Sequence, residues 1–388
     1  MDGVKYMERA IELAKKGIGA VDPNPLVGAV IVKDGRIIGE GYHERIGGLH
    51  AERITLASLK EDAAGAVMYV TLEPCCHYGK TPPCTQAIIE NKISKVVIGS
   101  RDPNPKVHGK GVGILRDAGI EVVEDFLKEG CDALNERFFH YISTGTPYVA
   151  MKYAMTADGK IATKTGASKW ISGEGSRMRV AELRNDFPAI MAGIGTVLSD
   201  DPRLTSRING GRDPVRIICD SDARIPMDSY IVNTAKDIPT YVVVAVPEME
   251  EGVVTDVIKD SHPSVPDKIQ SLLEKGVKII NVPDSHSPEI VGKRRVDLRK
   301  LMKYLGEQEI SGVLLEGGAV LNYSSLMAGI VQEIYVFTAP KIFGGRGKTP
   351  VEGEGVEIPD QAFGLELKST EKIDGDVLLR YKVINGKE

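Results

Sequence analysis

Four side chains in the first quarter of the chain have the types and spacing of a hydrolytic metal centre: His50, Glu52, Cys75 and Cys84. A catalytic Zn²⁺ takes three protein ligands, commonly imidazole and thiolate, and leaves its fourth position to water, whose pKa falls from about 15.7 to about 7. His50, Cys75 and Cys84 can supply these ligands. Glu52 is spaced to reach the water, so it could accept a proton and pass it to departing ammonia. The pattern predicts one zinc ion per chain and Glu52 as the catalytic residue of a deaminase.

The spacing resembles the signature of the cytidine-deaminase superfamily, H-x-E followed by P-C-x-x-C. The resemblance favours Cys75 over the adjacent Cys76 as a ligand, because the first cysteine of that signature directly follows the proline, here Pro74. In this chain, however, eight residues separate the two ligand cysteines. A longer loop costs little closure entropy. We therefore interpret residues 76–83 as a substrate-recognition loop, in which residues 77–80 would lie over the metal.

Two less specific interpretations of these residues are a structural zinc ion and reduced thiols in a core. Neither requires a glutamate beside the histidine ligand, so Glu52 favours catalysis. Asn24 lies in a proline-flanked loop and could hydrogen-bond the edge of a base, but a role as a turn-former is equally consistent with its side chain. His43 is a weaker candidate for such a contact.

Hydrophobic periodicity and turn residues define the elements that must position this centre. Apolar side chains at helical spacing predict a helix over 4–16, and an Asp-Gly turn joins two alternating runs into a β-hairpin. Helices are expected to begin near His50 and Cys84, where the positive helix end favours thiolate. The remaining expected elements are strands at 29–32, 37–40, 68–72, 95–98 and 121–123 and helices at 85–91 and 111–118. Their alternation predicts a three-layer α/β/α domain.

The second part of the chain also reads as α/β. Residues 141–147 have the turn chemistry of a linker, so we place the boundary at 145 and expect domains over 1–145 and 146–388. Residues 246–305 are charged and less regular, which suggests a lobe or a surface excursion. The expected strands of this domain are 148–154, 189–192, 215–220, 240–245, 277–282, 312–316 and 333–339.

Two of these strands end in glycines that open a helix, at Met191 to Thr196 and at Leu314 to Ser324. Such a turn lets backbone amides approach a phosphate group at the positive end of the helix. Two such turns could hold one dinucleotide. The segments lack a G-x-G-x-x-G followed by an acidic residue, which argues against an ordinary Rossmann site.

Several motifs of the second domain resemble the reductase domain of the bifunctional riboflavin-biosynthesis deaminase/reductase family. They begin at Lys152, Ser168, Gly195 and Asp220, and the Glu316-Gly-Gly turn is similar to the same family. The family's zinc motif also has the long spacing between cysteines found here, so the resemblance covers nearly the whole chain. It implies a cytidine-deaminase-like α/β/α domain followed by a dihydrofolate-reductase-like α/β domain that uses NADPH.

The resemblance also implies residue roles. The residues expected to contact NADPH are Ala154, Trp170, Thr196, Asp200, Ser221, Gly318, Ala319, Val320, Leu321, Asn322, Tyr323 and Ser324. The residues expected to contact substrate are Ser168, Arg184, Leu204, Arg207 and Glu316. Arg184 and Arg207 could fork onto a ribose phosphate, and Glu316 could hold ribityl hydroxyls. Lys152 could protonate a sugar oxygen or simply be salt-bridged, and Arg224 could meet the 2′-phosphate of NADPH or form a loop salt bridge.

The composition of the chain narrows the class of molecule that it is expected to bind. The net charge of −5 and the absence of a dense basic tract favour a small phosphorylated substrate over nucleic acid. No apolar stretch is long enough for a membrane span and the N-terminus does not resemble a signal peptide. Five cysteines, three of them near the metal motif, suit a reducing compartment. We expect a cytoplasmic enzyme, and the resemblance suggests a homo-oligomer.

The implied function is two consecutive steps of riboflavin biosynthesis. The first is zinc-dependent hydrolytic deamination of 2,5-diamino-6-ribosylamino-4(3H)-pyrimidinone 5′-phosphate. The second is NADPH-dependent reduction of the ribosyl group to give 5-amino-6-ribitylaminouracil 5′-phosphate. The alternative is a nucleoside or tRNA deaminase fused to a nucleotide-sensing regulatory domain that reduces nothing.

Overall fold

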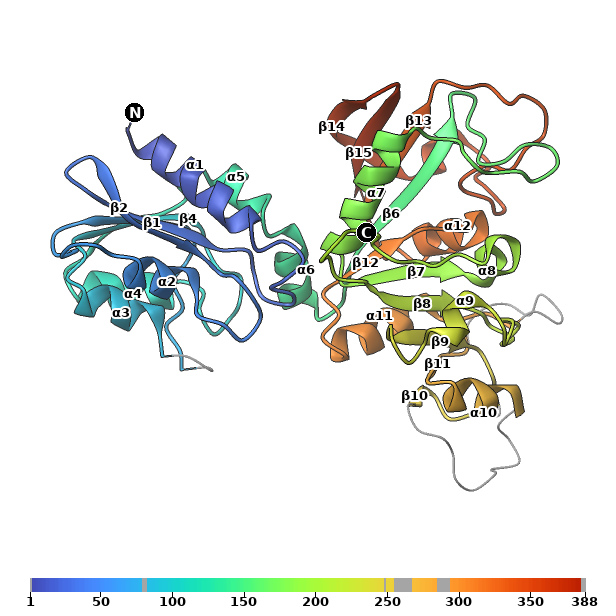
Figure 1. The fold of residues 1–388 in the computed structure, drawn as a ribbon, viewed down its shortest axis with the longest axis horizontal. Coiled ribbons are helices and arrows are strands. Elements are labelled where there is room, and N and C mark those ends of the chain that lie inside the picture. Colours follow the sequence, from blue (N-terminus) through green and yellow to red (C-terminus); the bar gives the residue numbers. More distant parts are fainter. Residues whose placement is uncertain (1, 79–81, 248, 255–266, 285–293, 385–388) are drawn as a thin grey trace. The chain divides into compact units, whose positions relative to one another are not determined.

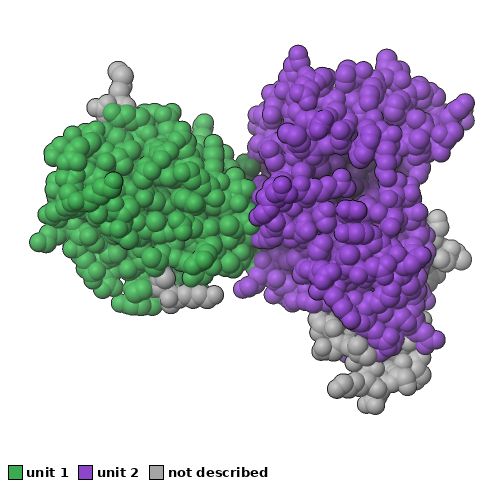
Figure 2. Space-filling view, viewed as in Figure 1, with its two compact units in different colours: residues 1–145 green, residues 146–388 purple. Residues whose placement is uncertain are grey.

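The chain forms two compact units, residues 1–145 and 146–388, which Figure 2 distinguishes by colour. A computed structural model describes residues 2–78, 82–247, 249–254, 267–284 and 294–384. Among these residues, no helix has both the length and the apolar composition that crossing a membrane requires.

The first unit is a five-stranded sheet between two layers of helices (Figure 1). Its strands are β1 (Gly28–Lys33), β2 (Arg36–Tyr42), β3 (Val67–Leu72), β4 (Lys95–Ser100) and β5 (Glu121–Val123). Its helices are α1 (Asp2–Lys15), α2 (Ala51–Ala57), α3 (Cys84–Glu90), α4 (Lys110–Asp117), α5 (Lys128–Asp132) and α6 (Glu136–Thr144). The strand order is β2-β1-β3-β4-β5, with β1 antiparallel to β2 and β3 and the remaining pairs parallel.

The alternation of side chains along β1 assigns the two faces of this sheet. Ala29 and Ile31 pack with α2, α3 and α4 in the larger core, while Val30 packs against Tyr6 and Leu13 of α1 on the opposite face. The expected three-layer α/β/α arrangement is therefore present. It places His50 and Cys84 directly before and at the start of two helices on the same face.

The described residues of the second unit form a ten-stranded, mostly parallel sheet. Its strands are β6 (Tyr148–Thr156), β7 (Ala189–Gly193), β8 (Val215–Cys219), β9 (Thr240–Val244), β10 (Gly252–Val254), β11 (Lys278–Asn281), β12 (Gly312–Leu315), β13 (Val331–Ala339), β14 (Gly364–Ile373) and β15 (Asp376–Ile384). Its helices are α7 (Glu174–Asp186), α8 (Ile194–Asp200), α9 (Tyr230–Asn233), α10 (Asp267–Glu274), α11 (Leu298–Glu307) and α12 (Ala319–Met327), and Pro359–Gln361 is a 3₁₀ turn. The order is β10-β11-β9-β8-β7-β12-β6-β13-β15-β14.

Helices cover both faces of this sheet. Leu301 of α11 and Leu326 of α12 pack on one face. On the other, Leu183 of α7 packs with Ala150 and Leu314, and α8, α9 and α10 continue the layer over β7, β8 and β9. The mixed α/β fold class expected for the second domain is confirmed.

Three features of the structure differ from what the sequence indicated. Residues 141–144 are the last turn of α6 rather than linker, because the turn-forming residues there still lie on an amphipathic helix. The described parts of 246–305 are not a surface excursion: β10 and β11 extend the sheet and α11 covers it. The hairpin β14–β15 was not expected, since β14 is exposed along nearly its whole length and lacks alternating burial.

Candidate functional site

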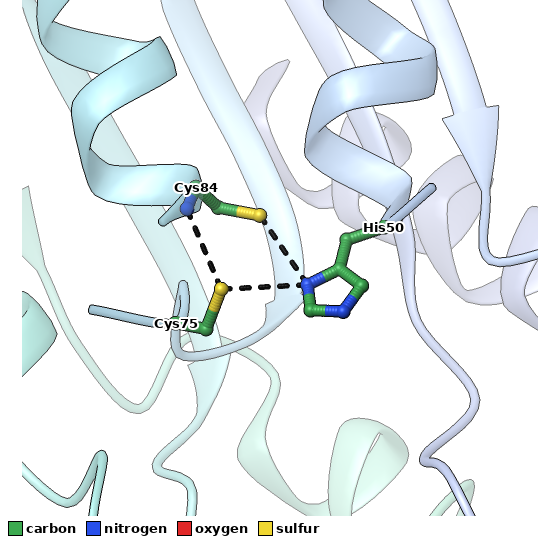
Figure 3. Close-up of side chains that lie close together, drawn as sticks. All are labelled: His50, Cys75 and Cys84. Atoms are coloured by element: carbon green, nitrogen blue, oxygen red, sulfur yellow. Dashed lines mark hydrogen bonds between the residues drawn. The ribbon is translucent and has the colours of Figure 1, made fainter. Parts of the chain in front are cut away.

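The predicted zinc ligands come together in the first unit. The Nδ1 atom of His50 lies 3.4 Å from the Sγ atom of Cys75 and 3.4 Å from that of Cys84. All three donor atoms lie within 4.8 Å of one another, and Figure 3 shows them facing a common point. Two thiolates and an imidazole around one point are a donor set that Zn²⁺ accepts, with a fourth position left for water.

Secondary structure fixes each donor. His50 is the residue before α2, Cys84 is the first residue of α3, and Cys75 follows β3. The backbone N–H of Cys84 also donates to the sulfur of Cys75 at 3.4 Å. The guanidinium of Arg53 donates to the carbonyls of Pro82 and Pro83, at 3.1 and 3.0 Å. Arg53 thus ties the end of the long inter-cysteine loop to the helix that follows His50.

The pKa values of the Cys75 and Cys84 thiols shift in opposite directions, which agrees with a site for a cation between the two sulfurs. The Cys84 thiol hydrogen-bonds to Cys75, and together with His50 it lowers the pKa of Cys75 to about 4. The same hydrogen bond, and burial, raise the pKa of Cys84. These opposite shifts make Cys75 the thiolate and Cys84 the thiol of the pair. A dication would remove this difference, because it stabilises both thiolates.

Glu52 lies beside this cluster and is almost inaccessible to solvent, at 3 % exposure. Burial raises the pKa of Glu52 to about 7, and the negative charge of Cys75 adds to the effect. A carboxyl group that titrates near neutrality can both accept and donate a proton. This is the behaviour expected of the deaminase acid and base.

Two described residues of the recognition loop have hydrogen-bond partners outside it. The ring of Tyr78 is 75 % exposed and its hydroxyl donates to Gln86 on α3 at 3.1 Å. The sulfur of Cys76 turns to the carbonyl of Lys106 at 3.6 Å, so Cys76 is not part of the donor cluster. Residues 79–81 lie outside the described part of the chain.

Asn24 and His43 lie next to the cluster. The Nδ1 atom of His43 is 2.9 Å from the carbonyl of Leu49, and its Nε2 atom is 3.2 Å from the Asn24 amide nitrogen. These contacts assign the proton to Nδ1, so that Nε2 accepts from Asn24. Burial lowers the pKa of His43, and its ring packs edge-on against His50 at 5.7 Å between centroids. The base-binding interpretation of Asn24 is compatible with this arrangement.

The sequence reasoning overlooked Asp102. This residue follows the carboxyl end of β4, is 7 % exposed, and has a pKa that burial raises to about 6. Its Oδ1 atom accepts the backbone N–H of Asn104 at 2.8 Å. Its position two residues after a buried parallel strand could have identified Asp102 from the sequence. The ends of such strands meet at one edge of the sheet.

A second cluster of charged side chains lies in the second unit, around Glu316. The register of β12 and β6 pairs Leu315 with Met151, which places Glu316 beside Lys152 on the face covered by α7. The Lys152 Nζ atom is 3.2 Å from Glu316. Arg184 of α7 forks the same carboxylate, with Nε at 2.6 Å and Nη2 at 2.9 Å. Lys152 is thus salt-bridged, one of its two expected states.

This cluster contacts the segment that carries two other predicted substrate residues, Leu204 and Arg207. Arg184 donates from Nη1 to the carbonyl of Thr205 at 3.2 Å. The side chain of Leu204 is buried in the core at 3 % exposure. Arg207 is exposed, and partial burial of its guanidinium and the positive charges of Arg184 and Arg203 lower its pKa. Ser168 is half-buried in the loop after β6.

The two glycine turns predicted to hold a dinucleotide are adjacent. Gly193 donates its N–H to the carbonyl of Gly317 at 2.8 Å, and a Cβ atom at Gly318 would lie 3.7 Å from the hydroxyl of Thr196. Gly318 is the N-cap of α12 and offers no side-chain acceptor. Helix geometry leaves the N–H groups of the first turn, including Ala319, Val320 and Leu321, pointing out of the helix end. The place suits a phosphate group.

The remaining predicted cofactor residues differ in their hydrogen-bond partners and in their exposure to solvent. Asn322 and Tyr323 turn toward another segment, since Asn322 donates to the carbonyl of Pro350 at 2.8 Å and Tyr323 to that of Gly355 at 3.3 Å. Trp170 is 61 % exposed, with the Arg177 guanidinium 4.8 Å from its ring centroid. Four other residues are accessible from solvent to different degrees: Ala154, Asp200, Ser221 and Ser324.

The position of Arg224 is compatible with both interpretations made from the sequence, a loop salt bridge and a contact with the 2′-phosphate of NADPH. Its Nε atom lies 3.7 Å from the buried carboxylate of Asp220, so the loop ion pair exists. The side chain is nevertheless 56 % exposed, and it follows the end of β8, next to the strand that carries the Gly193 turn. A phosphate could reach it there.

Two protein families account for the two units. The cytidine and deoxycytidylate deaminase zinc-binding region matches residues 2–100. The RibD C-terminal domain matches residues 147–379. The riboflavin biosynthesis protein RibD of Actinobacillus pleuropneumoniae is 51 % identical over 99 % of this chain and 96 % of its own length. The protein of the same name from Aquifex aeolicus is 40 % identical over 97 % of both chains.

Solved structures give the same result. A diaminohydroxyphosphoribosylaminopyrimidine deaminase/5-amino-6-(5-phosphoribosylamino)uracil reductase from Thermotoga maritima is 38 % identical and superimposes with a TM-score of 0.81 over 98 % of both chains. RibD of Acinetobacter baumannii is 34 % identical, with a TM-score of 0.83 over 99 % of both chains.

Proposed function

Because this chain belongs to the RibD family of riboflavin-biosynthesis enzymes, we propose that it catalyses two consecutive steps with separate sites. Residues 1–145 deaminate 2,5-diamino-6-ribosylamino-4(3H)-pyrimidinone 5′-phosphate with zinc. Residues 146–388 reduce the ribosyl group of the product with NADPH to give 5-amino-6-ribitylaminouracil 5′-phosphate. The observation that carries the first half is the buried Glu52 beside three zinc-type donors.

In the deaminase site, His50, Cys75 and Cys84 hold the metal. Bound zinc supplies Lewis acidity that makes a water molecule nucleophilic near neutral pH. Glu52 would accept one proton from the attacking water and pass it to the ring nitrogen; it would then accept the second proton, from the new hydroxyl group on the ring carbon, and pass it to the amino group that leaves as ammonia. Its almost complete burial matches this role, since a pKa near neutrality allows both steps. Asn24, held beside His43, would hydrogen-bond the pyrimidine edge.

In the reductase site, bound NADPH supplies a hydride for C1′ of the opened ribosyl group. The first turn of α12 binds cofactor phosphate through its backbone N–H groups, and the adjacent Thr196 borders the same place. Lys152 would donate a proton to the sugar oxygen as the ring opens. Glu316 would hold the ribityl hydroxyls or the developing positive charge, since it keeps its negative charge between two cations.

The geometry changes what we propose for one substrate residue. Arg184 uses Nε and Nη2 on Glu316, so its main role is to orient that carboxylate. Arg207, which is exposed and has another arginine nearby, is the better candidate for the ribose 5-phosphate. Ser168 and the backbone of Leu204 complete the substrate contacts.

The alternative, a nucleoside or tRNA deaminase fused to a nucleotide-sensing domain, is not supported. Riboflavin-biosynthesis relatives match the chain over nearly its full length, through both units. We also propose that the enzyme acts in the cytoplasm, where its free cysteines would stay reduced, and that it forms a homo-oligomer, as the family resemblance suggests.

A coupled assay tests the proposal. The zinc-loaded protein, incubated with the diaminopyrimidine phosphate and NADPH, should release one ammonia and oxidise one NADPH per substrate. NADPH oxidation should begin only after deamination. Ammonia release without NADPH oxidation would contradict the reductase assignment, and saturable NADPH binding without turnover would favour the sensing domain.

A further inference from the structure

Residues 201–207, which connect α8 to the approach to β8, have an unfavourable backbone. Three non-glycine residues there adopt left-handed conformations, with φ of +37° at Asp201, +52° at Leu204 and +61° at Arg207. A side chain with a Cβ atom rarely adopts this conformation unless surrounding contacts impose it. The segment also carries two predicted substrate residues, Leu204 and Arg207. Its conformation must therefore be held from outside.

Identifiable contacts hold it. The Asp201 carboxylate accepts the backbone N–H of Tyr230 at 2.9 Å, and the buried side chain of Leu204 anchors the middle of the segment. At the far end, both the N–H and the hydroxyl of Ser206 donate to Oδ1 of Asp213, at 2.8 and 3.1 Å. Ser206 is only 2 % exposed, so water cannot readily replace these bonds.

The hydrogen bonds of Ser206 lie where they can fix the position of Arg207. Ser206 is its chain neighbour, and Arg184 and Arg203 repel its guanidinium electrostatically. Arg184 also donates to Thr205 at 3.2 Å, so this end of the segment lies beside the Glu316 cluster. Without an anchor at Ser206, relief of strain and charge repulsion would both move Arg207 away from that cluster.

We propose that Asp213 is a positioning residue of the reductase: by holding Ser206 it fixes Arg207 where the phosphate of the substrate binds. This inference rests on the phosphate role that the proposed function gives to Arg207. Asp213 itself does not touch the substrate. It acts by keeping a cationic group pre-organised for an anion, so its removal should weaken binding of the phosphorylated substrate more than it slows the chemistry.

A purely structural role for Asp213 can be separated from this one. Asp213 and Asp237 both lie near the fully buried Arg216 and help to keep it charged. Asp237→Ala therefore removes a comparable carboxylate and is the matched control. Asp213→Asn is the conservative variant, because its amide oxygen can still accept both bonds from Ser206.

The test measures kcat and KM of the reductase with the deaminated phosphorylated intermediate and with its phosphate-free riboside, together with the KM for NADPH and the melting temperature. Asp213→Ala should raise the KM for the phosphorylated intermediate about five- to tenfold, as expected for the loss of ordinary hydrogen bonds. Its kcat, its KM for NADPH and its KM for the riboside should stay unchanged. Asp213→Asn should restore most of the loss, and Asp237→Ala should show none.

The outcomes also distinguish this inference from the proposed function. If Arg207→Gln raises the KM for the phosphorylated intermediate but Asp213→Ala does not, the inference alone is wrong. If Arg207→Gln has no effect, the phosphate role fails and the inference fails with it. An equal rise in KM for the riboside would reduce Asp213 to structural support. If Asp213→Ala does not fold, Ser206→Ala, which loses only the 3.1 Å bond, must show a smaller change of the same kind.

Discussion

The two sites of this enzyme bring charged or ionisable side chains into buried places, but they balance charge in opposite ways. The cluster of His50, Cys75 and Cys84, with Glu52 beside it, gathers electron donors that compete for protons. The cluster around Glu316 pairs one carboxylate with two cations, Lys152 and Arg184. The first arrangement is complete only with a cation. The second compensates its carboxylate within the protein and keeps a net positive charge, which suits a phosphorylated substrate.

The difference also concerns how each cluster is built. The first depends on residues at the starts of two helices, so short sequence motifs encode most of it. The second depends on the register between β6 and β12 and on the packing of α7. A substitution in the cluster of His50, Cys75, Cys84 and Glu52 should therefore reduce catalysis alone. A substitution in the cluster around Glu316 should reduce both catalysis and the stability of the fold.

The largest effect is expected for Glu52→Gln. The variant should bind zinc normally and lose deamination by about 10³- to 10⁴-fold, because the amide cannot move the proton. Reductase turnover on supplied intermediate should be unchanged. Ammonia release, metal content and NADPH oxidation are the measurements, and Glu8→Gln on the exposed side of α1 is the control. A Glu52→Gln protein that still releases ammonia at the wild-type rate would remove Glu52 from the mechanism.

A smaller catalytic effect, with a large effect on stability, is expected for Glu316→Gln. The change leaves the charges of Lys152 and Arg184 uncompensated in a buried place, which should cost about 3 to 5 kcal/mol in the free energy of unfolding of the second unit. Reductase activity should fall by about 10²-fold or more, while deamination should persist. Urea unfolding followed in the second unit, with both activities measured, tests this expectation.

The stability difference should depend on pH in a defined direction. Burial alone would raise the pKa of Glu316, but the charges of Arg184 and Lys152 outweigh it and hold the pKa well below its ordinary value. The ionised carboxylate therefore stabilises the fold fully above the unfolded pKa, about 4.3, and the contribution is lost as the pH falls below it. The gap between wild type and Glu316→Gln should be constant above about pH 6 and shrink in acid. A gap that widens in acid would contradict the ion-pair account.

The smallest effect is expected for Arg53→Gln. It removes the bonds to the Pro82 and Pro83 carbonyls that hold the loop before Cys84. Zinc affinity should fall by roughly tenfold, the lower end of what outer contacts of metal ligands contribute. Competition with a chelator measures it, and the control is Arg45→Gln, which changes an exposed arginine of the same unit. Unchanged zinc affinity would mean that the two helix starts alone organise the donors.

Most of the architecture could be predicted because its strands are regular and buried. Strands such as β3, β7 and β9 are short apolar runs between turn residues. The hairpin β14–β15 escaped prediction because β14 is an exposed edge strand, in which neither face selects apolar side chains. The described part of the charged region 246–305 was misjudged for a related reason: β10 has only three residues, too few to show a period. The strand expected at 277–282 is present as β11.

The sequence by itself determined the chemistry of the first site, since His50, Glu52, Cys75 and Cys84 lie at helix starts or strand ends whose local structure the chain encodes within a few residues. It also supplied the two glycine turns and the family resemblance. Only the tertiary structure decided that Arg184 hydrogen-bonds Glu316, that Tyr78 hydrogen-bonds Gln86 of α3, and that Asp213 accepts bonds from Ser206. These contacts depend on strand register and on which helix covers which face. A side chain's partner across a sheet is set by packing over long sequence separations, which no local pattern records.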